Sequence, residues 1–356
     1  MQHNSGIKKA PTNRIPRATS SRRTSTPELQ KTDARLGRIV RLLMAHATVV
    51  VSGTKIAEEI TTSRSEVWRL IQQLRDLGVS IAGHPATGYR LQTVPDLLLP
   101  DILAPLVRGT IFGSHLHHYY KVGSTNTVAM DAASAGAPEG SVFLGERQIA
   151  GRGRGAHIWH SPHSAGIYCS VILRPALPPS EALILSLAAG LAVHAAIQAI
   201  DPGVAVDLKW PNDLLIDGKK VAGILTEMNS EATRVRYIVI GIGINVNQAS
   251  FPSELQRTAT SLRLATGTEW SRVELCAALL KSLNREYRDL LEKPGAHDSI
   301  LRRFQEQSSS ARGCKVQVED NGGFDGTTEG LDQRGFLQVR TALGVRTVLS
   351  GTVRSK

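Results

Sequence analysis

Glycines alternate with arginines in the segment 151–154, Gly-Arg-Gly-Arg, which follows Gln148 and precedes Trp159. Glycines let backbone N–H groups approach a ligand closely. The planar guanidinium groups of Arg152 and Arg154 match the geometry of carboxylate and phosphate oxygens. The segment therefore predicts a binding loop for a small anionic substrate, and a flexible surface turn is the alternative.

The same loop nearly matches the dinucleotide-binding pattern G-x-G-x-x-G/A through Gly151, Gly153 and Ala156. That pattern requires a helix directly after the glycines. Here Pro162 comes next, followed by the apolar run 166–173. The order strand, loop, strand is therefore favoured over a dinucleotide site.

A second polar block spans residues 207–227 and contains the runs Lys209-Trp-Pro-Asn-Asp213 and Lys220-Val-Ala-Gly-Ile224. It predicts a strand, a proline-broken loop, a short strand, an Asp-Gly turn and a further strand. At the start of a buried strand, Lys220 could bridge two anions or hold Mg²⁺-bound phosphate, and a solvent-facing lysine is the alternative. The segments 234–240 and 241–247 predict another strand, which ends in a Gly/Asn turn where Asn245 could reach a phosphate or metal.

Ser124-Thr125-Asn126 joins a strand to a predicted helix at 127–134. A hydroxyl of Ser124 or Thr125 would cap that helix. Groups beside a helix N-terminus also bind polar ligands, and both roles are compatible. Further on, Pro178-Pro179-Ser180 starts a long buried helix at 181–200.

The segment 36–90 predicts helices at 38–46 and 54–60 and a third that starts after Ser63. Ser63 and Glu66 form the pattern of a capping box. The apolar residues of the third helix recur at helical spacing and predict a buried stripe of Val67, Leu70, Ile71, Leu74 and Leu77. Its remaining side chains face outward: Arg64, Ser65, Trp68, Arg69, Gln72 and Arg75. With a hairpin wing at 79–91, this pattern is that of a DNA-reading helix-turn-helix; a helical packing domain is the alternative.

The net charge of +11 lies mostly at the N-terminal end. Residues 1–35 carry a net charge of +6 and residues 36–95 a net charge of +3, so the other 261 residues carry only +2. A basic N-terminal part on an otherwise nearly neutral chain favours nucleic acid as a partner. Residues 1–35 are also poor in large apolar side chains, which predicts a disordered basic tail.

The remaining features bound the class of protein. Residues 253–309 predict helices, and short alternating strands from Cys314 onward predict a small β-barrel. The three cysteines lack metal-ligand spacing, which excludes a cysteine metal site and fits a reducing cytoplasm. The runs 182–193 and 238–246 are too short or interrupted to span a bilayer, and no signal peptide is recognised. We therefore expect a cytoplasmic protein without a membrane partner.

Taken in order, these blocks resemble the biotin protein ligases, specifically the bifunctional bacterial type that also represses the biotin operon. The resemblance covers residues 36–356. It depends on five motifs in the family's order and spacing: Ser124-Thr125-Asn126, Gln148-x-x-Gly-Arg-Gly-Arg154 with Trp159 and Ser161-Pro162, Lys209-Trp-Pro-Asn-Asp213, Lys220-Val-Ala-Gly-Ile224 and Gly241-Ile-Gly-Ile-Asn245.

The resemblance implies an α+β fold with three parts after the tail 1–35. These are a winged helix-turn-helix domain (36–95), a catalytic domain (106–309) whose mixed sheet carries helices on one side, and an SH3-like barrel (310–356). A connection at 95–105 joins the first two parts. The resemblance also implies a homodimer that binds operator DNA. This homodimer would biotinylate a lysine of a carrier protein such as that of acetyl-CoA carboxylase. ATP and Mg²⁺ are the implied cofactors, and biotinyl-5′-AMP is the implied intermediate.

The resemblance also implies residue roles. The biotin group comprises Ser124, Thr125, Asn126, Gln148, Arg152, Gly153, Arg154 and Lys220. Arg152, Arg154 and Lys220 are the implied catalytic residues, and the ATP group comprises Arg154, Trp159, Lys209, Asn212 and Asn245. Mg²⁺ enters with ATP near Asn212 and Asn245, without a cage of protein ligands. The implied DNA contacts are Arg64, Ser65, Trp68, Arg69 and Gln72.

The chain departs from the family's sequence at one place in the loop, and two alternative functions remain open. After Arg154 the family usually has further arginines, whereas this chain has Gly155-Ala156-His157. The loop therefore loses cationic donors, which predicts weaker adenylate retention, and His157 could make retention pH-sensitive. The alternatives are a lipoate or octanoate ligase of the same superfamily, and a biotin-sensing DNA-binding regulator without catalysis.

Overall fold

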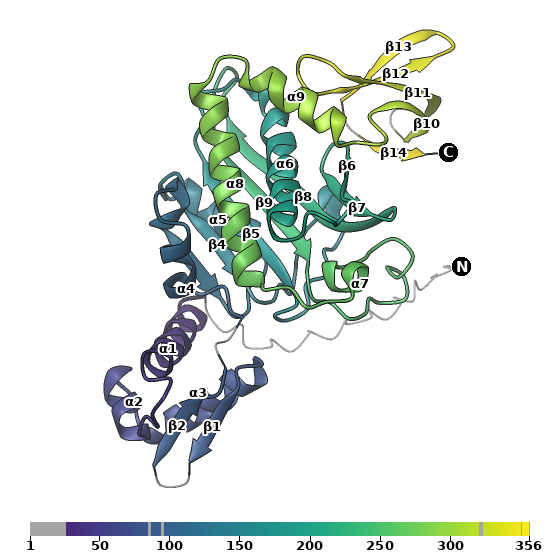
Figure 1. Ribbon diagram of the computed structural model, residues 1–356. Coiled ribbons are helices and arrows are strands. Elements are labelled where there is room, and N and C mark those ends of the chain that lie inside the picture. The colour runs from purple at the N-terminus through teal and green to yellow at the C-terminus, as the bar shows by residue number, and fades with distance from the viewer. Residues whose placement is uncertain (1–25, 85–86, 94–95, 320–322, 350, 356) are drawn as a thin grey trace, which may run out of the picture.

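The computed structural model describes residues 26–84, 87–93, 96–319, 323–349 and 351–355 (Figure 1). A winged helical unit lies at one end, a seven-stranded mixed sheet in the middle and a five-stranded antiparallel sheet beside it. The predicted α+β class and the order of its parts are confirmed. Most of the predicted tail, residues 1–25, lies outside the described residues.

The winged unit consists of α1 (Thr26–Ala45), α2 (Gly53–Glu59), α3 (Arg64–Asp76) and a hairpin of β1 (Ile81–His84) and β2 (Gly88–Leu91). The first helix begins twelve residues before its predicted start, so residues 26–35 are helical and not part of a disordered tail. Its inner face buries Leu36, Ile39, Val40 and Leu43 in one cluster with the apolar stripe of α3. Of that stripe, only Leu77 stays partly exposed.

Half of the predicted capping box forms at the start of α3. The Ser63 hydroxyl accepts a hydrogen bond from the Glu66 backbone N–H at 3.2 Å. The Glu66 carboxylate binds Arg69 at 2.6 and 2.8 Å and does not return to Ser63. An i,i+3 ion pair on the exposed face has therefore replaced the reciprocal bond.

The described part of the predicted connection, residues 96–105, contributes to the core. Leu97, Leu98 and Leu99 are buried, and α4 (Pro100–Leu106) follows. Pro100 does not prevent this helix, because it occupies the first turn, where a proline is tolerated.

The central sheet has the order β3-β4-β5-β9-β8-β7-β6, and only the β3–β4 pair is parallel. Its strands are β3 (Leu116–Tyr119), β4 (Val142–Gly145), β5 (Gly166–Leu173), β6 (Asp207–Lys209), β7 (Asp213–Ile216), β8 (Lys219–Ser230) and β9 (Val235–Asn245). The 151–154 loop lies between β4 and β5, as predicted. The strand predicted from 234 through the 241–247 segment is β9, which ends at Asn245.

One face of this sheet packs on α6 (Leu183–Ile200) and α8 (Arg272–Glu292), with α9 (Ala296–Glu306) beside α6 (Figure 1). The helix α5 (Thr125–Ser134) lies on the opposite face, so the implied arrangement with helices on one side is wrong. Short helices complete the unit: α7 (Leu262–Thr266) and the 3₁₀ turns η1 (Ile111–Gly113), η2 (Arg154–Ala156) and η3 (Pro179–Glu181).

The segment Pro179–Ile200 is long and apolar enough to cross a bilayer, which contradicts the length that we inferred from sequence. Two thirds of its most apolar window are buried inside the protein. This helix is the central core helix, which packs on α8 and on the sheet.

The C-terminal sheet has the order β13-β12-β11-β10-β14, with every pair antiparallel. Its strands are β10 (Arg312–Glu319), β11 (Phe324–Leu331), β12 (Leu337–Thr341), β13 (Gly344–Val348) and β14 (Thr352–Ser355). This arrangement is consistent with the predicted small barrel, although no β13–β14 pairing occurs among the described residues. The indole N–H of Trp210 donates to the Gly335 carbonyl at 2.9 Å and fastens this sheet to the central one.

Candidate active site

The α5 side of the central sheet has a floor of glycines. On β8 and β9, side chains alternate between faces, so Ile242 and Ile244 enter the core while Gly241 and Gly243 face the opposite side. A Cβ atom at Gly243 would lie 2.6 Å from the Trp159 ring. A Cβ at Gly223 would lie 2.8 Å from Lys220 Cε. These glycines create the space in which the loop and Lys220 lie.

Above this floor the structure gathers every residue of the predicted biotin group into one inner pocket of ≈ 430 Å³. Its lining includes Ser124, Thr125, Asn126, Gln148, Arg152, Gly153, Arg154, Trp159 and Lys220. A second, outer pocket of ≈ 1720 Å³ adjoins it. The outer pocket gathers the whole predicted ATP group, Arg154, Trp159, Lys209, Asn212 and Asn245, together with His157.

Lys220 lines both pockets. Its Nζ lies 2.6 Å from Asp213 Oδ1 and 5.3 Å from the centre of a Trp159 ring. The backbone beneath it is fixed because the Asn245 amide donates to the carbonyls of Lys220 and Thr260, at 3.4 and 3.0 Å. The structure thus places one lysine ammonium where the two pockets meet, and Asn245 supports its backbone from below.

Helix α5 starts at the inner pocket without the predicted hydroxyl cap. Ser124 occupies the capping position, but its side chain makes no capping hydrogen bond. The Thr125 backbone N–H instead donates to Gln148 Oε1 at 2.9 Å. Gln148 therefore caps this helix from the neighbouring loop, and the Ser124 hydroxyl is left to the pocket that it lines.

A buried serine that sequence reasoning missed joins the polar residues of this pocket. Ser170 lies on β5, and its Oγ is 2.6 Å from Asn126 Oδ1 and 2.8 Å from Thr125 Oγ1. Gln148 continues the chain by donating to Ser161 Oγ at 3.0 Å. The available signal was the placement of Ser170 in an otherwise apolar strand.

The 151–154 loop folds back over the pocket as a narrow hairpin. The Gly153 N–H donates to the His157 carbonyl at 2.7 Å, and Arg152 forms a β-bridge with Ile158. Arg152 Nη2 lies 2.8 Å from Glu227 Oε2, a contact that the sequence did not predict. Arg154 is exposed at the rim that the two pockets share.

The outer pocket offers hard oxygen donors. Asn212 donates through Nδ2 to the Ile224 carbonyl at 2.8 Å, so the amide oxygen of Asn212 points away from that carbonyl. The Asp213 carboxylate is adjacent. By contrast, the Asn245 amide oxygen accepts from Gln248 Nε2 at 3.1 Å. Among the described residues, no three His, Cys, Asp or Glu side chains cluster as a metal cage.

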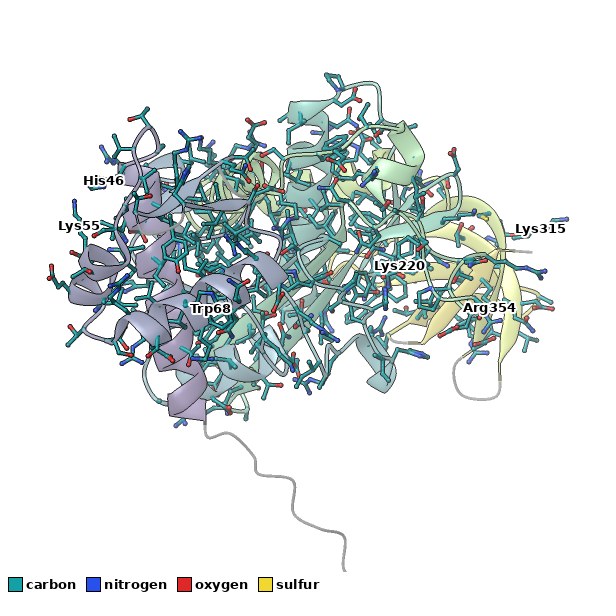
Figure 2. The ribbon with its side chains drawn as sticks, turned by 90° about the horizontal axis from the view of Figure 1, so that it is seen from below. His46, Lys55, Trp68, Lys220, Lys315 and Arg354 are labelled. Atoms are coloured by element: carbon teal, nitrogen blue, oxygen red, sulfur yellow. The ribbon has the colours of Figure 1, made fainter. Side chains whose placement is uncertain are left out.

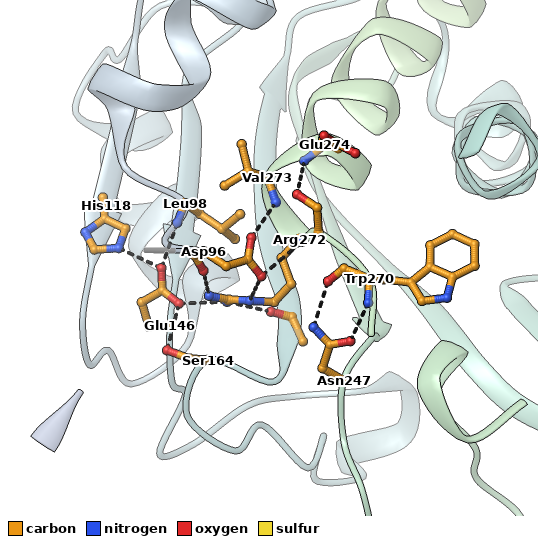
Figure 3. A network of polar contacts seen from close by, with 12 residues as sticks. Asp96, Leu98, His118, Glu146, Ser164, Asn247, Trp270, Arg272, Val273 and Glu274 are labelled. Carbon is orange, nitrogen blue, oxygen red and sulfur yellow. Dashed lines mark hydrogen bonds and ion pairs between the residues drawn. The ribbon is translucent and has the colours of Figure 1, made fainter. Parts of the chain in front are cut away.

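A buried charge network surrounds Glu146, the residue that follows β4 (Figure 3). Glu146 and Arg272 are both buried and pair at 2.7 Å, and Asp96 also binds Arg272, at 3.2 Å. Burial opposes ionisation of Glu146, but Arg272 and His118 outweigh it and hold the pKa of its carboxyl well below the ordinary value. The network joins the connection after the winged unit to residue 146, two positions before Gln148.

The predicted DNA-contacting residues lie on α3, well away from Lys220 (Figure 2). Arg64, Ser65, Trp68 and Arg69 are exposed, with Trp68 58% exposed, and Gln72 is half-buried. Arg75, which we expected to face outward, donates to the Ile81 carbonyl at 2.8 and 3.0 Å and anchors the wing.

Two family models match the chain. The biotin/lipoate A/B protein ligase family matches residues 119–245, which contain the inner pocket. A helix-turn-helix domain model matches residues 35–90.

Known proteins are similar over most of the chain. The bifunctional ligase/repressor BirA of Bacillus spizizenii is 36% identical over 318 residues, which cover 88% of this chain and 97% of that protein. The Escherichia coli BirA is 30% identical over 286 residues, which cover 80% of this chain and 87% of the E. coli protein. The biotin protein ligase of Aquifex aeolicus, solved with biotin and ATP, has a TM-score of 0.60 and 29% identity, and covers 68% of this chain and 100% of its own. The chain therefore belongs to the family of bifunctional biotin ligase/repressor proteins.

Proposed function

We propose that this protein joins biotin to ATP and then transfers biotin to a lysine of a carrier protein. The observation that carries this proposal is the shared position of Lys220, at the junction of a small polar pocket and a larger outer one. The inner pocket takes biotin, and the carboxylate of biotin points toward Lys220. The outer pocket takes ATP, so the α-phosphate lies at the same junction.

In the first step the biotin carboxylate attacks the α-phosphate, which forms biotinyl-5′-AMP and releases pyrophosphate. Bringing an anion onto a polyanion requires positive charge between them. Electrostatic stabilisation and positioning therefore contribute most of the catalysis of such a step. Lys220 supplies that charge at the junction, and Arg152 and Arg154 supply it from the loop. Ser124, Thr125 and Gln148 orient the polar head of biotin, and Trp159 packs along the nucleotide.

The donor set of the outer pocket fits Mg²⁺ that arrives with ATP. Magnesium prefers carboxylate and amide oxygens and keeps several waters. The Asn212 oxygen and the Asp213 carboxylate meet that preference, and Asp213 Oδ1 also pairs with Lys220 Nζ at 2.6 Å. The Asn245 amide is engaged with the Lys220 and Thr260 carbonyls and with Gln248. When bound, the ion would neutralise phosphate charge, and Lys209 would assist from the wall of the pocket.

In the second step the amine of the carrier lysine attacks the acyl carbon of the mixed anhydride and expels AMP. The hairpin loop excludes water from the anhydride until the carrier arrives. The acetyl-CoA carboxylase carrier subunit is the proposed acceptor. His157 at the loop's rim makes adenylate retention weaker than an arginine would.

We propose four units: a basic tail predicted at 1–35, whose residues 26–35 belong to α1 and so join the winged unit, a DNA-binding domain at 36–95, a catalytic domain at 106–309 and a C-terminal barrel at 310–356. The exposed face of α3 reads operator DNA through Arg64, Ser65, Trp68, Arg69 and Gln72. A homodimer in the cytoplasm matches a two-fold operator and represses transcription in response to biotin.

Mass spectrometry of the bound product tests this function. The purified protein is incubated with biotin and MgATP and then freed of unbound small molecules. We expect biotinyl-5′-AMP to be recovered with the protein. Recovery of unreacted biotin alone would contradict catalysis and favour a biotin-sensing regulator.

A further inference from the structure

Glu227 on β8 places a carboxylate beside the inner pocket. Its Oε2 lies 2.8 Å from Arg152 Nη2 and accepts a hydrogen bond from Asn126 Nδ2 at 2.8 Å. Its Oε1 lies 3.1 Å from the same Arg152 nitrogen. A carboxylate repels a carboxylate ligand, so attraction of the substrate does not explain this residue.

The position of Glu227 is fixed from the core side. An ionised carboxylate only accepts hydrogen bonds, so the amide N–H₂ of Asn126 must face Glu227 and its oxygen must face Ser170. The Asn126 oxygen accordingly lies 2.6 Å from the buried Ser170 hydroxyl. Asn126 is itself 3% exposed and packs against Gly241, where no side chain would fit.

Arg152 has the opposite character, because its side chain is 45% exposed and projects from a glycine-rich hairpin. Among the described residues only its Nη2 is engaged, and the partner is Glu227. A guanidinium has five N–H donors in a rigid fork. Fixing one nitrogen therefore leaves the other donors of Arg152 available to a ligand in the pocket that it lines.

We propose that Glu227 is a positioning residue for biotin: it anchors the Arg152 guanidinium to the wall of β8 and so aligns the hairpin over the substrate. The chain Ser170–Asn126–Glu227–Arg152 connects the rigid sheet to an exposed arginine. A donor that is already aligned costs less entropy when the ligand binds. This inference rests on the proposed assignment of the inner pocket to biotin.

Glu227→Gln tests the proposal, because it keeps the shape but loses the charge and puts an N–H₂ group beside the guanidinium. We expect biotin affinity to fall about 10- to 100-fold, the range for lost hydrogen bonds to charged groups. Affinity for ATP should fall much less, since neither Glu227 nor Arg152 lines the outer pocket. Glu231→Gln is the matched control: that carboxylate is exposed and pairs with Arg236 at 3.0 Å, beyond the end of β8.

A double variant separates positioning from a structural role. If Glu227 acts through Arg152, Glu227→Gln should change biotin affinity less than twofold in an Arg152→Ala background. An undiminished loss in that background, or wild-type affinity in folded Glu227→Gln, would overturn the proposal. Should Glu227→Gln not fold, Glu227→Asp keeps the charge but shortens the reach, and it should weaken biotin binding in the same Arg152-dependent way.

The proposed function fails in a different way. If the wild-type protein itself does not bind biotin by calorimetry, the assignment of the pocket is wrong. If the wild type binds biotin and Glu227→Gln binds it equally well, only the positioning role is wrong.

Discussion

Arg272 Nη1 lies 2.7 Å from Glu146 Oε2, and both side chains are buried. The pair joins the first residue of α8 to the end of β4. Arg272 also donates to the Gly166 carbonyl at 3.2 Å, and the Leu98 N–H donates to Glu146 at 2.9 Å. Four segments far apart in the sequence therefore converge on one ion pair.

Replacing Arg272 with methionine should destabilise the protein. The substitution leaves the Glu146 carboxylate buried without its main partner, which costs about 3–5 kcal/mol in comparable pairs. Urea unfolding measures the loss. The double variant Arg272→Met with Glu146→Gln should recover part of it, and equal stability of single and double variants would contradict the account.

The same pair predicts an acid-dependent stability. The folded-state pKa of Glu146 is depressed below its ordinary value of 4.5, so its stabilisation is complete above about pH 4.5 and is lost as the pH falls below. The free energy of unfolding should therefore drop more steeply below that pH in the wild type than in the Arg272→Met/Glu146→Gln variant. Unfolding curves between pH 3 and pH 7 measure both slopes, and parallel curves would show that Glu146 does not contribute.

A permanent positive charge at position 157 of the loop should slow the release of biotinyl-5′-AMP from the protein. His157 is exposed at the outer pocket, and its carbonyl holds the Gly153 N–H. In His157→Arg we expect biotinyl-5′-AMP release to slow about fivefold, the scale of an exposed charge pair. Stopped-flow dissociation measures the rate. His157→Gln is the neutral control, and an unchanged or faster rate in the arginine variant would contradict the prediction.

DNA binding should depend on the exposed end of α3. Arg64→Ala should lower affinity for duplex DNA and, if Arg64 contacts phosphate, reduce the slope of log affinity against log salt by about one. Fluorescence anisotropy over a range of salt concentrations measures both quantities. Arg285→Ala removes the same charge from an exposed position on α8 and should change neither. Equal effects of the two variants would argue against a DNA-reading α3.

Sequence patterns predicted the grouping of the site well, because each motif is local and the family order fixes which strand ends meet. The two pockets contain every predicted biotin and ATP residue. Periodicity likewise located α3 and the wing, since one apolar stripe specifies one buried face.

The missed features depend on contacts between distant segments. Glu227 and Ser170 are polar residues in strands, and only the strand register places them beside Asn126. The reason for the glycines in β9 was not visible in the sequence, because only the presence of Trp159 above Gly243 shows why a strand lacks a side chain there. Leu97–Leu99 looked like a linker, since their burial depends on the winged unit and the catalytic sheet together.

The most direct test of the central claim is exchange of labelled pyrophosphate into ATP, with biotin, lipoate or octanoate as the acid. Exchange with biotin alone is the predicted result. It should fall at least about 100-fold in Lys220→Met, the scale for loss of a charge-stabilising donor, and persist in Lys219→Met, which removes the exposed neighbouring lysine. Exchange with lipoate or octanoate alone, or undiminished exchange in Lys220→Met, would contradict the account.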